Sequence, residues 1–218
     1  MSVLIFANGD IEGVEWIRPY LTPPHTIIAA DGGTRHLLAL GIFPDVVVGD
    51  MDSLSPEVAA WLETAVVQHI RFPVQKDETD LELALLHAAT QYEGDILVFG
   101  AFGGRVDQAL GNIFLLAHPT LYGRCVELVD RFQRLRLINA ADGVAEVHGR
   151  SGDTLSLIPL GVDVQIRATT GLAWSLQQET LAFGPARGIS NQMTADVATI
   201  AVGYGRLICI HTRQEWGR

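Results

Sequence analysis

The chain has 218 residues, of which 48% are hydrophobic and 18% charged, so a disordered low-complexity protein is excluded and one large domain or two small ones are expected. Its 15 basic and 25 acidic residues give a formal net charge of −10, which argues against a protein that wraps nucleic acid or an anionic membrane. All of this acid excess falls within residues 1–135, which hold 18 acidic and 8 basic residues.

Strand-like and helix-like segments alternate in this first part. Apolar runs that end near glycine or acidic residues predict strands at 2–7, 26–30, 45–48, 66–72 and 95–99. Between them, helices are predicted to begin at Ser55, at Thr79 and at Arg105, because Ser55 precedes a proline and Thr79 starts a Thr-x-x-Glu capping box. The alternation predicts an α/β domain with a doubly wound, mostly parallel sheet.

From about residue 124 the pattern changes to short alternating runs, beginning with CVELV at 125–129 and separated by turns that contain glycine. No good helical pattern follows, which is typical of an antiparallel β-sandwich. We therefore expect an α/β domain at 1–135 and an all-β sandwich domain at 136–218, the second with balanced charge.

Two features of the sequence bear on the compartment. Cys125 and Cys209 lie far apart in β-like runs, so we expect buried, reduced thiols rather than a disulfide framework or a zinc site. The N-terminal segment has no basic stretch before its short apolar run, and no apolar stretch approaches the roughly 20 residues that cross a bilayer. These observations favour a cytoplasmic protein.

Acidic residues follow several of the predicted strands: Asp31, Asp50, Asp52, Asp77, Asp80 and Asp107. The carboxyl ends of parallel strands meet at one edge of a sheet, where ligands bind. Neighbouring carboxylates repel one another unless a cation lies between them, and Mg²⁺ takes such ligands together with substrate phosphate oxygens. Asp50-x-Asp52 alone fits a simple turn, and Asp80 alone fits a first helical turn, so the Mg²⁺ prediction depends on the whole set.

A phosphate group is a second candidate ligand at this edge. Gly103-Gly104 before the helix at Arg105 fits close backbone approach to a phosphate, although a tight turn is also open. Lys76 is the single lysine, and both a phosphate contact and a solvated surface position are open for it. Neither a P-loop nor a G-x-G-x-x-G dinucleotide motif occurs in the chain.

The second part contains one conspicuous aromatic residue, Trp174, at the end of a Gly-Leu-Ala-Trp segment. An isolated tryptophan is most often a core residue, and stacking on a flat cationic ring is the functional alternative. A polar turn, Gly188-Ile-Ser-Asn191, follows it.

In their order along the chain, these segments resemble the thiamine pyrophosphokinase family. The matching motifs are Asp31-Gly-Gly, Gly41-Ile-Phe-Pro-Asp45, Gly49-Asp-Met-Asp-Ser53, Lys76-Asp-Glu-Thr-Asp80, Gly103-Gly-Arg-Val-Asp107 with Asn112, Gly171-Leu-Ala-Trp174 and Ile189-Ser-Asn191. Two positions depart from the pattern of many members: Gln108 stands where they have histidine, and Ala173 where they have lysine.

The resemblance implies an N-terminal α/β catalytic domain, a C-terminal β-sandwich that helps to bind thiamine, ATP as cosubstrate and Mg²⁺ as cofactor. It implies a homodimer in which thiamine lies between the catalytic domain of one subunit and the β domain of the other. The Mg²⁺ ligands it implies are Asp50, Asp52 and Asp80. Around the nucleotide we expect Asp31, Lys76, Asp77, Thr79, Gly103, Gly104, Arg105, Asp107 and Asn112. The thiamine residues it implies are Trp174, Ser190 and Asn191.

The reaction implied is transfer of the β,γ-pyrophosphoryl group of ATP to the thiamine hydroxyl, which gives thiamine diphosphate and AMP. We expect Asp50, Asp52, Asp80 and Arg105 to carry the catalysis by positioning groups and neutralising charge. One alternative is a metal-dependent phosphohydrolase, because VVVGDMDSL loosely fits an apolar strand followed by Asp-x-Asp. Another is a thiamine or nucleotide sensor that binds without turnover.

Overall fold

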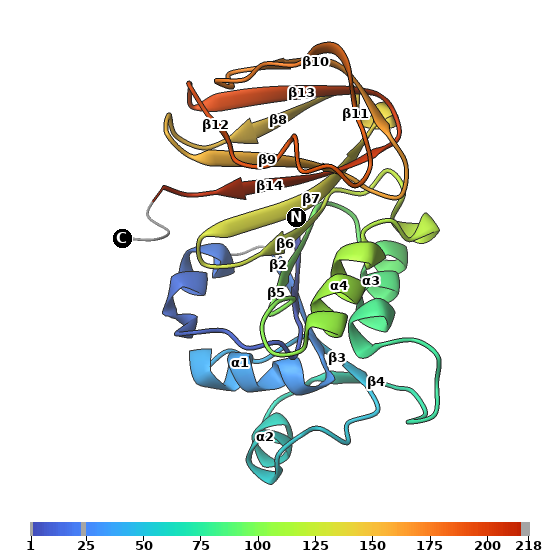
Figure 1. Ribbon diagram of the computed structural model, residues 1–218. Coiled ribbons are helices and arrows are strands. Elements are labelled where there is room, and N and C mark those ends of the chain that lie inside the picture. The colour runs from blue at the N-terminus through green and yellow to red at the C-terminus, as the bar shows by residue number, and fades with distance from the viewer. Residues whose placement is uncertain (1, 23–24, 215–218) are drawn as a thin grey trace. The chain divides into compact units, whose positions relative to one another are not determined.

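The computed structural model describes residues 2–22 and 25–214, and the chain divides into two compact units, Met1–Arg131 and Phe132–Arg218. Each unit contains its own layers of secondary structure (Figure 1). Among the described residues, no helix combines the length and the apolar character that crossing a membrane requires.

Parallel strands form the sheet of the first unit. In its described part the strands are β1 (Ser2–Phe6), β2 (His25–Ala30), β3 (Val46–Gly49), β4 (Gln68–Arg71), β5 (Ile96–Phe99) and β6 (Val126–Val129). Their order in the sheet is β6-β5-β1-β2-β3-β4. The apolar runs that become β1, β2, β3 and β5 lie inside the sheet and are largely buried, as parallel sheets require, whereas β4 is an edge strand and is mostly exposed.

Helices connect these strands. The α-helices of the first unit's described residues are α1 (Thr34–Leu40), α2 (Pro56–Leu62), α3 (Asp80–Gln91) and α4 (Val106–Leu115). Short 3₁₀ helices are η1 (Val14–Leu21), η2 (Asp31–Gly33) and η3 (Pro119–Leu121). The predicted caps are confirmed, because the side chains of Ser55 and Thr79 accept hydrogen bonds from the third residue beyond each.

Side chains on alternate positions of each strand reach opposite faces of the sheet. Leu4 and Phe6 of β1 share a core cluster with Leu37 of α1 and Leu62 of α2. Helix α3 packs against β2 and β3, and Figure 1 shows it on the side of the sheet away from α1. Its predicted apolar face is confirmed, since these side chains are buried: Leu81, Ala84, Leu85 and Ala88.

The second unit contains two antiparallel sheets. Its strands are β7 (Gln133–Asn139), β8 (Val144–His148), β9 (Thr154–Pro159), β10 (Val164–Thr170), β11 (Gln177–Leu181), β12 (Asn191–Gln192), β13 (Val197–Tyr204) and β14 (Arg206–Thr212), with a 3₁₀ turn η4 (Ala140–Asp142). One sheet has the order β12-β9-β14-β7 and the other β11-β10-β13-β8. Leu155 and Leu207 of the first sheet share a core with Ile166 and Ile200 of the second, which confirms the predicted sandwich.

Two expectations from the sequence are wrong in detail. The run at 125–129 was expected to begin the antiparallel region, but β6 pairs in parallel with β5 and completes the α/β sheet. Cys125 lies just before β6 and is exposed, whereas Cys209 on β14 is buried as expected. Cys125 is exposed because it lies outside the strand, whose own apolar positions are the buried ones.

Candidate active site

The strand order of the first unit reverses beside β1. The chain builds β2, β3 and β4 to one side of β1 and then returns to place β5 on the other side. In open α/β sheets this switch point leaves a crevice at the carboxyl ends of the two neighbouring strands, and ligands bind there. A cavity of about 530 Å³ lies at this point, lined by Asn8 and Gly9 after β1 and by Gly100 and Ala101 after β5.

The two loops at the switch point are held together by backbone contacts. The amide of Gly9 donates to the carbonyl of Gly100 at 2.9 Å. A β-carbon on residue 9 would lie 2.2 Å from the carbonyl oxygen of Phe102, so only glycine allows this approach. The floor of the cavity is therefore fixed by main-chain geometry.

Many of the predicted residues of the first unit line this one cavity: Asp31, Thr79, Asp80, Gly103, Arg105, Asp107 and Asn112. Asn8, Gly9 and Gln108 also line it. Our site prediction missed Asn8 and Gly9, although the signal was present: Asn8-Gly9 follows a predicted strand, as the chosen acidic residues do.

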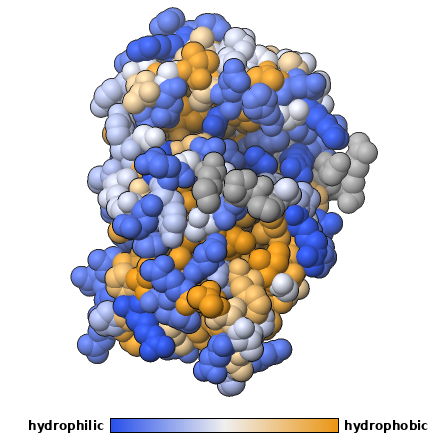
Figure 2. Space-filling view, turned by 180° about the vertical axis from the view of Figure 1, so that it is seen from behind, coloured by the Kyte–Doolittle hydropathy of each residue, from blue (hydrophilic) through white to orange (hydrophobic). Residues whose placement is uncertain are grey.

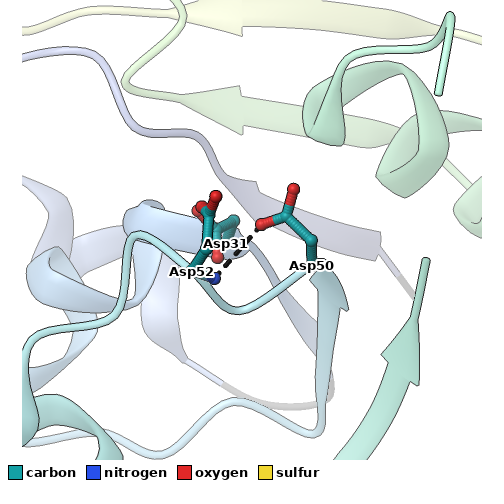
Figure 3. Close-up of side chains that lie close together, drawn as sticks. All are labelled: Asp31, Asp50 and Asp52. Atoms are coloured by element: carbon teal, nitrogen blue, oxygen red, sulfur yellow. Dashed lines mark hydrogen bonds between the residues drawn. The ribbon is translucent and has the colours of Figure 1, made fainter. Parts of the chain in front are cut away.

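Three carboxylates gather at the ends of β2 and β3. Asp31, Asp50 and Asp52 each place an oxygen within 4.8 Å of the others, as the close-up shows (Figure 3). The turn that brings Asp52 back toward Asp50 is closed by a hydrogen bond from the Asp52 amide to Asp50 Oδ1 at 3.1 Å. Hard oxygen ligands at this spacing suit Mg²⁺.

Asp31 is the most constrained member of this acidic group. Its φ of 42° lies in the left-handed region, which is strained for a residue with a β-carbon, and its side chain is buried. Burial raises the pKa of Asp31, a hydrogen bond from Ser53 opposes this, and the charges of Asp80 and Asp50 raise the pKa further. Its Oδ1 is buried and has no hydrogen-bond partner among the described residues. A buried carboxylate oxygen without a partner fits a cation ligand.

Lys76 provides the positive charge nearest to this group. Its ammonium lies 3.2 Å from Asp50 Oδ2 and 3.0 Å from Asp80 Oδ1, and its side chain is only 10% exposed. The solvated-surface alternative for Lys76 is therefore wrong. The backbone amide of Asp52, assisted by Lys76, holds the pKa of Asp50 below its usual value.

The glycine loop before α4 brings a cation, Arg105, to the cavity. Gly103 and Gly104 have φ of 89° and 71°, which only glycine adopts easily, and Arg105 then forms the N-cap of α4. The Arg105 guanidinium contacts the Asp107 carboxylate, with Nε 3.1 Å from Oδ1, and both side chains are largely exposed. Arg105 is thus held beside a helix N-terminus that lines the cavity.

Two other predicted residues form hydrogen bonds to backbone groups near the cavity. Asn112 Nδ2 donates to the carbonyl of Ala101 at 2.8 Å, so α4 is tied to the loop after β5. Thr79 caps α3 and thereby sets the position of Asp80 in the first turn. Asp77 is exposed and does not line the cavity.

The predicted residues of the second unit form a separate cluster. Trp174 is 65% exposed, so the core alternative for this residue is wrong. Asn191 holds the tryptophan backbone from both sides, because its Oδ1 accepts from the Trp174 amide at 3.1 Å and its Nδ2 donates to the Trp174 carbonyl at 2.7 Å. Ser190 has φ of 61°, and its amide donates to Ser156 Oγ at 3.0 Å. Asn191 thereby presents the indole to solvent.

In this parallel α/β unit Asp31, Asp80 and the glycine-arginine loop line one cavity, and Lys76 pairs with Asp80 and with Asp50 of the acidic group. This arrangement suits a metal-dependent enzyme of phosphate group transfer. The second unit adds an exposed, rigidly held aromatic residue. These features define the class of protein.

Comparison with known proteins supplies the family. Residues 18–128 match the family model of the thiamin pyrophosphokinase catalytic domain, and residues 144–207 match that of the thiamin pyrophosphokinase vitamin B1 binding domain. Thiamine pyrophosphokinase of Bacillus subtilis (strain 168) is 31% identical over 212 residues, which cover 97% of this chain and 98% of the relative. The chain belongs to the thiamin pyrophosphokinase family.

Solved structures agree with this assignment. The crystal structure of thiamine pyrophosphokinase from Bacillus subtilis superposes with a TM-score of 0.87 at 28% identity, covering 98% of this chain and all of the other. That of thiamin pyrophosphokinase from Geobacillus thermodenitrificans gives 0.85 at 28% identity, with 99% of both chains covered. These relatives favour the transferase prediction over the phosphohydrolase and the sensor.

Proposed function

We propose that the chain transfers the β,γ-pyrophosphoryl group of ATP to the hydroxyl of thiamine, giving thiamine diphosphate and AMP. The observation that carries this proposal is the matching of both units to the two domains of one enzyme family, together with an acidic cavity at the switch point of the first. As a reaction that consumes ATP, it is expected in the cytoplasm.

In this reaction the thiamine oxygen bonds to the β-phosphorus, the bond from that phosphorus to the bridging oxygen of AMP breaks, and the hydroxyl proton passes to a base. Asp80 is the carboxylate favoured for this role over Asp52, because Asp80 lines the cavity and Asp52 does not. Arg105 exchanges Asp107 for phosphate oxygens, and the amides at the N-terminus of α4 bind the same oxygens. Positioning and neutralisation of charge account for the catalysis.

Asp50, Asp52 and Asp80 are the proposed Mg²⁺ ligands, and the unpartnered oxygen of Asp31 makes it a further one. The bound ion would neutralise charge on the β- and γ-phosphates. The other predicted residues of the first unit would contact the nucleotide or shape the loops around it: Lys76, Asp77, Thr79, Gly103, Gly104, Asp107 and Asn112. Asp50→Ala and Asp52→Ala should abolish turnover without unfolding the chain, and full activity of either variant would refute the metal assignment.

Thiamine is proposed to lie against the second unit, on Trp174, with Ser190 and Asn191 at the same turn. The thiazolium ring of thiamine is cationic, so an exposed indole face attracts it. The boundary predicted between residues 135 and 136 would cut β7, so we place the division between the catalytic domain and this thiamine domain at Arg131 and Phe132, where the two compact units divide. Trp174→Ala should raise the KM for thiamine far more than the KM for ATP, and Trp174→Phe should retain most of the affinity.

We further propose a homodimer. Val106, Leu110 and Phe114 are 74%, 48% and 54% exposed, and they follow one another at four-residue spacing along α4, a helix with no buried residue. Such a stripe normally faces a partner. Figure 2 shows that other hydrophobic residues also reach the surface, so exposure alone does not single out α4; the absence of any buried residue on it does.

The oligomeric state has a direct test. Phe114→Asp should convert the dimer into a monomer in light scattering, because a charge in an apolar interface is costly. Val66→Asp is the matched control, since Val66 is fully exposed outside any helix or strand of the same unit and should leave the dimer intact. A wild-type monomer, or a Phe114→Asp dimer, would contradict the proposal.

A mixed dimer tests whether partners share the thiamine site. Asp50→Ala and Trp174→Ala chains carry different affinity tags, are co-expressed, and are purified over both tags. If each site combines Asp50 of one chain with Trp174 of the other, one site per mixed dimer is intact and about half of wild-type activity returns. If both residues of a site come from one chain, activity stays at the level of the single variants.

A further inference from the structure

The second unit contains a cavity that the proposed reaction does not use. Its volume is about 630 Å³, and basic side chains line it: Arg134, His148, Arg150, His211 and Arg213, with Asp153 as the acidic lining residue. These residues come from β7, the end of β8, the β8–β9 turn and the end of β14, so the fold gathers them from distant parts of the sequence. The chain as a whole is acidic, whereas residues 132–218 hold 7 acidic and 8 basic residues.

Asp153 does not neutralise the arginines, because its oxygens have other partners. Oδ2 accepts from His211 Nε2 at 2.8 Å and from the Arg150 amide at 2.9 Å, while Oδ1 accepts from the Gln214 amide at 2.9 Å. Burial alone would raise the pKa of Asp153, but these hydrogen bonds outweigh it and hold that pKa below its usual value. Asp153 is therefore an anion whose acceptor capacity is largely used inside the protein.

The same carboxylate fixes the positions of two arginine-bearing segments. Through its backbone contacts Asp153 ties the turn that carries Arg150 to the chain after β14 that carries Arg213. Gly149 allows this packing, since a β-carbon there would lie 2.6 Å from His211 Nε2 and 2.9 Å from Asp153 Oδ2. Both side chains of the His211–Asp153 pair are more than nine-tenths buried. The cavity is thus built on a rigid polar base.

Two of the arginines that line the cavity, Arg150 and Arg213, have no carboxylate partner among the described residues. Over the described ranges, neither Arg150 nor Arg213 forms an ion pair, and both residues are exposed. His148 lies 3.4 Å from Glu146, which is outside the cavity lining. Arginines held by a fixed backbone around one cavity match the forked geometry of phosphate oxygens.

We propose that this cavity binds a small phosphate-bearing anion, at a site distinct from the catalytic cavity of the first unit. Arg150 and Arg213 would each donate to phosphate oxygens, and an N–H of the His148 ring would add a further donor. The ligand is a free phosphate or pyrophosphate, or the phosphate end of a nucleotide or of a phosphorylated product. The site does not depend on the proposed reaction.

Hydrogen–deuterium exchange tests this proposal and localises the binding. The full chain in EDTA is exposed to inorganic pyrophosphate, and amide exchange is compared in the peptides that contain 149–153 and 211–214. We expect slower exchange there in the wild type and in Arg167→Gln, a matched control that removes an exposed arginine of β10 outside the cavity. The Arg150→Gln/Arg213→Gln double variant should need at least about tenfold more pyrophosphate, because two charge-assisted donors are lost.

Titrations with other phosphate compounds identify which of them the site binds. Inorganic phosphate, AMP and thiamine diphosphate are titrated in the same way, and the ligand that protects at the lowest concentration is the one the site recognises. Unchanged catalytic turnover in the double variant shows that its fold is intact; if the double variant does not fold, Arg150→Gln alone is used. The proposal is overturned if no phosphate compound slows exchange at these peptides in the wild type, or if the Arg150→Gln/Arg213→Gln double variant is protected as well as the wild type.

Discussion

Lys76→Met is the substitution whose effect the geometry of the active site defines best. In the ligand-free chain the Lys76 ammonium lies 3.2 Å from Asp50 Oδ2 and 3.0 Å from Asp80 Oδ1. Methionine has a similar length and removes the charge. The variant therefore leaves two carboxylates facing each other beside Asp31, without a cation.

The expected loss in the free energy of unfolding follows from the distances between these charges and from their burial. Coulomb's law with an effective dielectric constant of about 20 gives about 5 kcal/mol for unit charges at 3.2 Å, and desolvation and side-chain entropy offset much of this. Removing one partner of a fully buried pair costs about 3–5 kcal/mol, and of an exposed pair about 0–1 kcal/mol. Since Lys76 and Asp50 are each 10% exposed and Asp80 is 30% exposed, we expect a loss of about 2 kcal/mol in the free energy of unfolding in EDTA.

Mg²⁺ should reverse this loss. In the variant the ion no longer competes with an ammonium group for the carboxylates, so it should stabilise Lys76→Met more than the wild type. Turnover should nevertheless fall, by roughly 10- to 100-fold, because a phosphate contact is lost. Lys76 would thus hold the carboxylates together until metal and nucleotide arrive.

Urea unfolding in EDTA and in Mg²⁺ measures both effects. A background with Trp174→Phe and Trp216→Phe leaves Trp16 and Trp61 of the first unit as fluorescent reporters. Arg71→Met is the matched control, because it removes an exposed cation of β4 that lines no part of the cavity. Equal stability of Lys76→Met and the wild type in EDTA, with an equal response to Mg²⁺, would refute the reasoning.

Three other predictions concern single positions. Gly9→Ala should lower the free energy of unfolding by about 1–3 kcal/mol in a urea titration, since its β-carbon would lie 2.2 Å from a carbonyl oxygen, whereas Gly111→Ala, whose β-carbon meets nothing within 4 Å, should cost nothing. Asp31→Asn should weaken Mg²⁺ binding more than tenfold in calorimetry without lowering stability in EDTA; unchanged affinity would show that its buried oxygen is no ligand. Asp153 has a lowered pKa in the folded chain, so its carboxylate contributes stability above its ordinary value of 3.8, and that contribution is lost as pH falls through the folded-state pKa. Asp153→Asn should therefore be less stable than the wild type at pH 7, and the gap should close below about pH 4; a gap independent of pH would contradict the role of His211.

Local signals in the sequence predicted a large part of the fold. Ser55 and Thr79 cap their helices through bonds to residues three positions away, so a short window contains the whole cause. Helix α1 was missed because Thr34–Leu40 is only seven residues long and shows little periodicity. The direction of β6 was misjudged because its partner β5 lies about 30 residues earlier, and nothing within 125–129 distinguishes parallel from antiparallel pairing.

In the candidate site, too, local sequence signals predicted some features, while others depend on contacts between distant segments. Strand ends placed Asp50 and Asp107 in the sequence prediction, because parallel topology fixes where such ends meet. Strand ends also predicted that Asp31 lies at this edge with Asp50 and Asp52, but its left-handed backbone and its burial arise only from tertiary packing. The two hydrogen bonds between the Asn191 side chain and the backbone of Trp174 could not be predicted either, because turns of different strands bring these residues together.

Isotope transfer tests the central claim most directly. The purified chain is incubated with Mg²⁺, thiamine and ATP labelled with ³²P at either the β- or the γ-position, and the products are separated. Transfer of an intact pyrophosphoryl group predicts that both labels appear in thiamine diphosphate and that unlabelled AMP forms in equal amount. Release of ADP with thiamine monophosphate, or transfer of the γ-label alone, would contradict the account.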